Sequence, residues 1–315
     1  MRHDVNDAPP SRGRRESEKH AWGFHPRATV PALALVLTGF LVLAPSALAN
    51  FITPKAGGSP NANEIHSLYM IVLYLAAVVC VIVEGALLYS VFKFRAKKNK
   101  VAAQIHGNSR LEIGWTVAAA LILVVLTVVT FIKLPAIVNP PNSDANAFAP
   151  PEAALSQPTP PNGKKLTICV QGRQFIWRYT YGNGCLTSSF TANNNKGLPY
   201  SYTTMVVPVH TTVVLDIQST DVIHSWWIPQ LGGKVDAVPG YTTYTWFKPL
   251  HTGIFRGQCA QLCGTNHAAM VAFVKVVTPA QYTAWTQQQQ QLITAQNSQV
   301  AQLRQILTQN GQLGS

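Results

Sequence analysis

The chain has 315 residues, of which 47% are hydrophobic and only 11% are charged. A typical soluble domain carries about 25% charged residues, so this composition excludes an ordinary soluble globule and indicates membrane segments. The formal net charge is +12, but the basic residues gather beside apolar runs, which is typical of membrane topology and argues against a nucleic-acid partner. The 5 cysteines are too few for a fold built on disulfides.

The first apolar run, residues 28–47, follows a basic, polar leader. It ends in Pro-Ser-Ala-Leu-Ala at residues 45–49, and small residues in this place are typical of a signal-peptidase site. Residues 1–49 are therefore expected to be a signal peptide with a polar leader. The alternative is a retained membrane anchor, which the length of the leader favours slightly.

Two further apolar runs, residues 68–91 and 113–132, are each long enough to cross a hydrocarbon core at about 1.5 Å of rise per residue. They predict a transmembrane hairpin within residues 50–139, with helices over about 66–94 and 112–134. The connection between the two runs is basic, containing Lys93, Arg95, Lys97, Lys98, Lys100 and Arg110. The positive-inside rule places this connection in the cytoplasm. We therefore expect a multi-pass protein in the lipid bilayer of the plasma membrane, with the rest of the chain on the outer face.

Three regions follow the hairpin. Residues 140–165 contain three Pro-Pro pairs separated by small and polar residues, a composition that favours a linker or a surface insertion. Residues 166–278 alternate short β-branched and aromatic runs with Gly, Pro and Asn turns, which predicts an all-β sandwich or barrel. Residues 279–315 are rich in Gln and space their apolar residues roughly as a helix does, so a helix followed by a tail is expected.

One short segment near the end of the β-rich region concentrates metal-binding side chains. Cys259 and Cys263 are four residues apart, His267 comes four further on, and Met270 follows three later. Thiolate and thioether sulfurs combined with imidazole suit copper. His224, in an aromatic segment 35 residues before Cys259, is the expected ligand from a second loop.

Other interpretations of these residues explain less. A zinc site would use cysteine and histidine but has no use for Met270. A disulfide between Cys259 and Cys263 would leave His267 and Met270 unexplained. A mononuclear blue-copper site needs one cysteine, so the second thiolate favours two coppers bridged by both sulfurs.

The hairpin, the His224 segment and the cysteine loop together resemble subunit II of the haem–copper cytochrome c oxidases, over roughly residues 60–285. The His224 segment runs on to Pro229, Gly232, Lys234, Asp236, Pro239 and Gly240. The resemblance implies a two-helix transmembrane hairpin followed by a cupredoxin-like sandwich or barrel with a dinuclear copper A centre. That centre would accept electrons from cytochrome c and pass them to haem in subunit I, where oxygen is reduced to water with proton translocation.

The resemblance also implies a role for each ligand. Cys259 and Cys263 would bridge the two copper ions, His224 and His267 would each bind one, and Met270 and the backbone carbonyl of Gln261 would be further ligands. Position 261 departs from the family, which often has Glu there, with a side chain that helps to hold magnesium near the subunit interface. Gln261 keeps the backbone carbonyl but lacks the side-chain charge, so the sequence leaves open whether a magnesium ion binds at that interface.

Two further positions are compared with the family. Glu112, at the cytoplasmic edge of the second span, resembles a carboxylate at the mouth of a proton channel in subunit I, and the alternative is a solvated interfacial carboxylate. The family receives electrons near a Gln-Trp-aromatic-Trp pattern, where this chain has Phe175 in place of the first tryptophan and keeps Trp177. Either ring could receive the electron, and core packing is the alternative for both.

Two further features of the sequence are the remaining cysteines and the charge balance of the region after the hairpin. Cys169 and Cys185 could form a disulfide or remain two buried thiols. From Pro140 onward the chain has ten Lys and Arg against five acids, a poor match for a strongly basic donor. We expect a cytochrome c that is not strongly basic, or one tethered in the same membrane. The alternative function is a copper-binding electron-transfer or copper-delivery module outside an oxidase.

Overall fold

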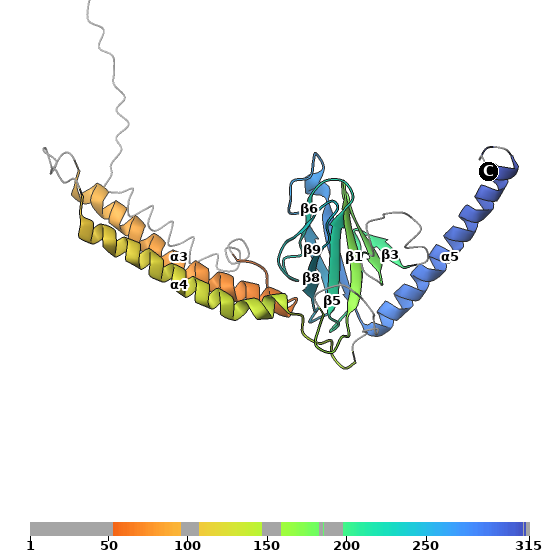
Figure 1. The fold of residues 1–315 in the computed structure, drawn as a ribbon, viewed down its shortest axis with the longest axis horizontal. Helices are drawn as coiled ribbons and strands as arrows, with labels where there is room; N and C mark the ends of the chain where they lie inside the picture. Colours follow the sequence, from red (N-terminus) through yellow and green to blue (C-terminus); the bar gives the residue numbers. More distant parts are fainter. Residues whose placement is uncertain are drawn as a thin grey trace, which may run out of the picture. The chain divides into compact units, whose positions relative to one another are not determined.

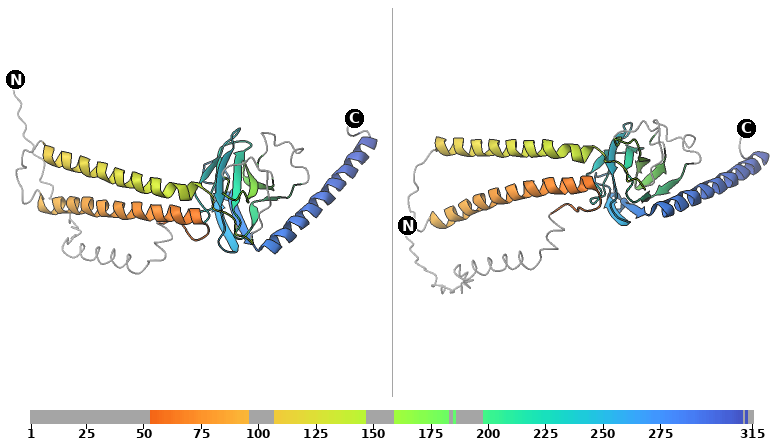
Figure 2. Two further views of the ribbon diagram at one scale, coloured as in Figure 1. Left: turned by 60° about the horizontal axis from the view of Figure 1, so that its bottom comes forward. Right: turned by 90° about the horizontal axis from the view of Figure 1, so that it is seen from below.

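The computed structural model describes residues 53–95, 107–146, 159–182, 185, 198–310 and 312. They belong to one compact unit of the chain, Ile52–Ser315. The expected signal peptide, residues 1–49, lies outside the described residues, as does part of the proline-rich region. Figures 1 and 2 show a pair of long helices, a β-sandwich and a C-terminal helix.

The hairpin consists of α3 (Pro60–Lys93) and α4 (Ser109–Val138), and both helices are long and apolar enough to cross a membrane. The Asn108 side chain caps α4 by accepting a hydrogen bond from the Leu111 N–H. Helix α3 begins six residues before the predicted start at residue 66, and α4 ends four residues after the predicted 134. The reason is that hydropathy marks only the lipid-facing part of a helix, whereas the first turn of α3 is buried against the β-domain.

Buried polar contacts join the hairpin to the β-domain. The Asn61 amide donates to the backbone carbonyl of Trp246 at 2.8 Å, and the Trp246 indole N–H donates to the carbonyl of Val138 at 3.0 Å. The backbone N–H of Lys248 donates to the Ser59 hydroxyl at 3.0 Å. These bonds tie the outer ends of both helices to one strand of the domain.

The β-domain has two main sheets. The first contains, in spatial order, β3 (Tyr200–Tyr202), β2 (Ile176–Tyr181), β1 (Leu166–Arg173), β5 (Val213–Ser219) and β8 (Thr243–Phe247). The second contains β4 (Thr204–Pro208), β10 (Val271–Val277) and β9 (Gly253–Gln258), and β6 (His224–Trp226) pairs with β7 (Val235–Ala237). Inward side chains from both main sheets, among them Ile168, Trp177, Leu215, Val207 and Val274, form one buried cluster. The predicted fold is confirmed: a transmembrane hairpin precedes an all-β cupredoxin-like sandwich.

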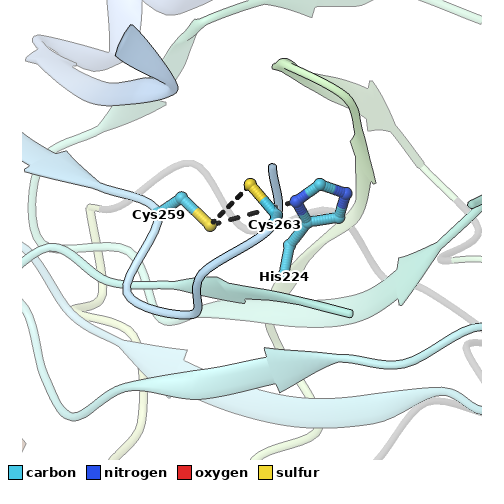
Figure 3. A group of neighbouring side chains, drawn as sticks. All are labelled: His224, Cys259 and Cys263. Atoms are coloured by element: carbon cyan, nitrogen blue, oxygen red, sulfur yellow. Dashed lines mark hydrogen bonds between the residues drawn. The ribbon is translucent and has the colours of Figure 1, made fainter. Parts of the chain in front are cut away.

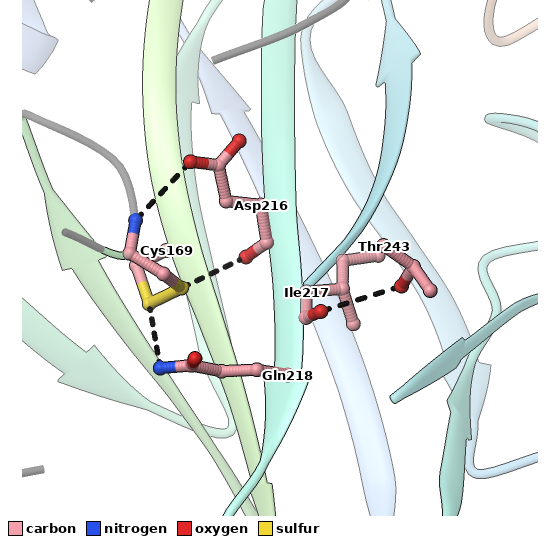
Figure 4. Close-up of a disulfide and its surroundings, with 6 residues drawn as sticks. Cys169, Asp216, Ile217, Gln218 and Thr243 are labelled. Carbon is pink, nitrogen blue, oxygen red and sulfur yellow. Dashed lines mark hydrogen bonds between the residues drawn. A yellow bond between two sulfur atoms is a disulfide. The ribbon is translucent and has the colours of Figure 1, made fainter. Parts of the chain in front are cut away.

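A disulfide joins Cys169 in β1 to Cys185, beyond the end of β2 (Figure 4). Cys169 is buried, and the backbone N–H of Cys185 donates to the carboxylate of Asp216 in β5 at 3.2 Å. Of the two alternatives for these cysteines, the structure therefore has the disulfide. It holds the chain that leaves β2 against the centre of the first sheet.

The chain ends in α5 (Pro279–Gln309), a single long helix. A capping box starts it, because the Thr278 hydroxyl accepts from the Gln281 N–H while the Gln281 side chain accepts from the Thr278 N–H. Tyr282 and Ile293 are its buried residues. The remaining turns are mostly exposed.

Candidate metal centre

The predicted ligands lie at the start of β6 and in the segment between β9 and β10. His224 opens β6, and Cys259 follows β9 directly. Because β9 and β10 are antiparallel neighbours, the segment between them must fold back. It closes with the Cys259 N–H donating to the Met270 carbonyl at 2.9 Å. The short 3₁₀ helix η1 (His267–Ala269) lies within this loop and starts at the second histidine.

Figure 3 shows the two cysteine sulfurs directed toward each other with the His224 ring beside them. The Cys259 and Cys263 sulfurs are 3.9 Å apart, and His224 Nδ1 is 3.9 Å from the Cys259 sulfur. One donor atom from each of these three buried residues lies within 4.8 Å of the others. A disulfide needs about 2.05 Å between sulfurs, so the pair is arranged as two separate thiols around a shared space.

The other predicted ligands join the same cluster. His267 Nδ1 is 3.5 Å from the Cys263 sulfur, and the Met270 sulfur is 3.9 Å from it. The backbone carbonyl oxygen of Gln261 is 3.2 Å from the Cys259 sulfur. The structure thus brings all six predicted donors together. Two thiols, two imidazoles, a thioether and a carbonyl form a mixed soft and borderline set that fits copper.

The two thiols differ in acidity. Burial raises the pKa of both, but at Cys259 hydrogen bonds, led by that with His224, outweigh burial and lower the pKa below its ordinary value. At Cys263, burial and the neighbouring charge of Cys259 raise the pKa. The Cys259 thiol therefore loses its proton readily, and the resulting negative charge disfavours deprotonation of Cys263. A bound cation removes that opposition, which is why this pair is suited to hold metal.

Asp221 is a site residue that the sequence prediction did not include. His224 Nε2–H donates to the Asp221 carboxylate at 2.9 Å, which leaves Nδ1 directed at the sulfurs. Burial by itself raises the pKa of Asp221, yet hydrogen bonds from the Gln174 N–H and from His224 outweigh it and lower the pKa. Metal-binding histidines usually donate their second N–H to such an acceptor, so an Asp three residues before the histidine was the available signal.

Gln174 connects the Asp221 carboxylate to the cysteine loop. Its backbone N–H donates to Asp221 at 2.7 Å, and its side-chain amide donates to the Cys263 carbonyl at 2.6 Å. The β1–β2 turn, the His224 loop and the cysteine loop are therefore held by one set of hydrogen bonds. This fixes the spacing between the donors on different loops.

The two aromatic residues of interest lie beside the cluster. Trp177 is fully buried, and its ring centroid is 5.8 Å from that of His224. Phe175 is partly buried against the core, and its ring reaches within 3.1 Å of where a Cβ at Gly264 would stand. Trp177 thus contacts a candidate ligand, whereas Phe175 packs against the cysteine loop.

Glu112 is not brought to the cluster. It lies in the first turn of α4, whereas Val138 at the other end of that helix meets the β-domain. At about 1.5 Å of rise per residue, the two positions are separated by about 39 Å along the helix. Any role of this carboxylate is therefore separate from metal binding.

Comparison with known proteins identifies the family of the chain. A family model described as the periplasmic domain of cytochrome c oxidase subunit II matches residues 166–277, and one for its transmembrane domain matches residues 48–132. Cytochrome c oxidase subunit 2 of Cereibacter sphaeroides is 36% identical over 267 residues, covering 75% of this chain and 81% of that protein. The chain belongs to the cytochrome c oxidase subunit II family.

Other members of the subunit II family show the same likeness. Cytochrome c oxidase subunit 2 of Alkalihalophilus pseudofirmus is 30% identical over 259 residues, covering 81% of this chain and 67% of that protein. Among solved structures, the periplasmic domain of subunit II of cytochrome oxidase from Bradyrhizobium japonicum is 31% identical, covering 41% of this chain and 95% of that one, with a TM-score of 0.35.

Family membership confirms the resemblance on which the sequence interpretation relied, and it favours an oxidase subunit over a copper-delivery module. The chain is a membrane protein with an outer β-domain whose clustered donors fit copper. The matched ranges end at residue 277, before α5 begins.

Proposed function

We propose that this chain is the electron-accepting subunit II of a respiratory terminal oxidase and holds two copper ions. Cys259 and Cys263 would bridge the ions, His224 and His267 would each bind one, and Met270 and the Gln261 carbonyl would complete the set. The observation that carries the proposal is the convergence of all six donors around two cysteine sulfurs 3.9 Å apart. When bound, the copper supplies one-electron redox chemistry between a cytochrome c and the haem of subunit I.

The residues of the chain prepare this site in two ways. His224, Cys259, Cys263 and Met270 are at most 5% exposed, so the protein keeps water away from the sulfurs. Asp221 and Gln174 fix the ring of His224 and the carbonyl of Cys263. Donors held at the ends of strands need little movement when the charge of the site changes, which lowers the cost of electron transfer.

The remaining parts of the oxidase follow from this assignment. Trp177, in contact with His224, or Phe175, beside the cysteine loop, would receive the electron from cytochrome c. Glu112, at the cytoplasmic end of α4, would supply protons to a channel in subunit I, where oxygen is reduced to water and protons are translocated. The complex would lie in the plasma membrane with the β-domain outside. Without a carboxylate at Gln261, a magnesium ion at the subunit interface would need its charge balanced by the partner subunit.

Copper loading of the full chain in detergent tests the proposal. We expect two coppers per chain and an electron paramagnetic resonance signal from one unpaired electron shared by both. Cys263→Ser should abolish that shared signal because it removes one bridging sulfur. Cys80→Ser is the matched control, since Cys80 lies exposed on α3, away from the site. One bound zinc with no stable copper would contradict the proposal.

A further inference from the structure

Helix α5 begins after residue 277, where the family-model match ends, and it carries none of the proposed copper donors, so the proposed electron transfer does not explain it. Its first turns are anchored to the β-domain. Tyr282 is 2% exposed, and the Trp285 ring centroid lies 4.8 Å from that of Tyr181 in β2. The helix is therefore placed by specific packing and is part of the folded domain.

A groove runs between α5 and three strands, the edge strands β3 and β4 and the neighbouring β10. Its volume is about 690 Å³, and its lining includes Tyr200, Tyr202, Lys275, Trp285, Gln289 and Leu292. One wall of the groove is the face of α5 that carries Trp285 and Ile293.

The same face of α5 continues past the groove as a seam in which six of eight residues are apolar. Tyr282, Trp285, Gln289, Ile293, Gln296, Val300, Leu303 and Leu307 follow one another at steps of three or four residues. Val300 and Leu303 are 50% and 56% exposed, and Ile306 beside them is 52% exposed. A seam with this spacing is the surface on which a second helix packs.

The exposed half of α5 needs such packing. Helices in proteins gain most of their stability from a buried apolar face rather than from intrinsic propensity. The sequence of this half is rich in Gln, with a single charged residue, Arg304, so surface ion pairs along the helix do not support it. A partner that covers Val300 and Leu303 would stabilise the helix.

The charges beside the seam indicate the character of that partner. Among the described residues of the groove and of α5, the charged side chains are Lys275 and Arg304, and none carries a carboxylate. A second copy of α5 would bring another arginine and no acid. We propose that the groove and the seam of α5 bind an acidic amphipathic helix of a partner protein, with its apolar stripe on Trp285, Val300 and Leu303.

Binding of two synthetic helices to the full chain in lipid nanodiscs tests this proposal. Both peptides carry leucine at the core heptad positions, and one has Glu and the other Lys at the flanking positions. Fluorescence anisotropy should show the Glu peptide binding about tenfold more tightly than the Lys peptide, because the charged side chains of the groove and of α5 are Lys275 and Arg304. Equal binding of both peptides would overturn the proposal.

Surface variants distinguish binding at the seam from non-specific hydrophobic binding. Val300→Gln combined with Leu303→Gln should weaken binding of the Glu peptide by about tenfold or more. Lys275→Glu should reverse the preference, so that the Lys peptide binds more tightly than the Glu peptide. Ile254→Gln is the matched control, since Ile254 is also an exposed apolar residue and lies on β9 outside the groove. The copper signal, recorded on the same samples, should stay unchanged and reports the proposed function separately. Concentration-dependent dimers of the wild-type chain that Val300→Gln with Leu303→Gln abolishes would assign the seam to a second copy and overturn the proposal.

Discussion

Gly172→Ala tests whether close packing against β1 positions the first histidine ligand. A Cβ at Gly172 would stand 2.9 Å from His224 Cδ2 and 3.0 Å from Trp177 Cζ3. Both rings are fully buried, so neither can turn into solvent, and at least one must shift by several tenths of an ångström. Overpacking of this kind costs about 1–3 kcal/mol. Any shift of the His224 ring also moves Nδ1 relative to the two sulfurs.

Two measurements on the full chain in detergent detect these effects. The thermal midpoint of the β-domain, followed by circular dichroism, should fall by about 2–4 °C for each kcal/mol lost. After copper loading, the hyperfine pattern of the paramagnetic signal should differ from wild type. Gly233→Ala is the matched control, because its Cβ would meet Ile65 at an ordinary 3.7 Å. An unchanged midpoint together with an unchanged signal would refute the idea that Gly172 sets the position of His224.

Three further predictions concern the hydrogen-bond support of His224, the proton supply and the cytochrome c donor. Asp221→Asn should weaken copper binding by about 10–100-fold, because His224 loses the acceptor of its second N–H. Competition with a copper chelator measures this affinity, and a wild-type value would show that Asp221 does not orient His224. Glu112→Gln should slow oxygen reduction by the assembled oxidase without altering the copper signal, because the carboxylate lies far along α4 from the cluster; unchanged turnover at several pH values would reject the proton role. Turnover with a strongly basic cytochrome c should stay level or rise as salt is added, because an outer domain with surplus positive charge gives such a donor no long-range attraction; a steep fall in rate would contradict this.

The parts of the fold that the sequence could predict are those that composition alone determines. A run of apolar residues as long as 113–132 has few folds open to it besides a transmembrane helix, and α4 covers it. The cysteine loop was visible because its sulfur and imidazole donors lie within one short segment. His224 was harder to place, because it lies 35 residues before the loop. The need for one further ligand and its aromatic, strand-like segment linked it to the loop, and the resemblance to an oxidase subunit agreed.

What the sequence could not predict depends on contacts between distant segments. Helix α3 starts earlier than predicted because Asn61 is buried against β8, and a hydropathy pattern does not detect such a contact. The role of Gly172 appears only when β1 is seen next to the rings of His224 and Trp177. The groove along α5 likewise combines strands and a helix from separate parts of the chain. Periodicity predicted the helix but not the surface that it would face.

The cysteines of the outer domain show how local structure decides their chemistry. Cys169 and Cys185 are linked, and Gln218 and Asp216 of β5 contact the pair. Cys259 and Cys263 are closer in sequence, yet their sulfurs stand 3.9 Å apart. Geometry accounts for the difference better than exposure, because Cys169 is as buried as Cys259.

At the candidate metal centre, each sulfur already has an imidazole facing it. His224 Nδ1 faces the Cys259 sulfur, and His267 Nδ1 faces the Cys263 sulfur. The Gln174 side-chain amide donates to the Cys263 carbonyl and so holds the backbone that carries the second sulfur. The arrangement thus leaves a space between the sulfurs in which a soft metal ion is a suitable partner for both thiolates.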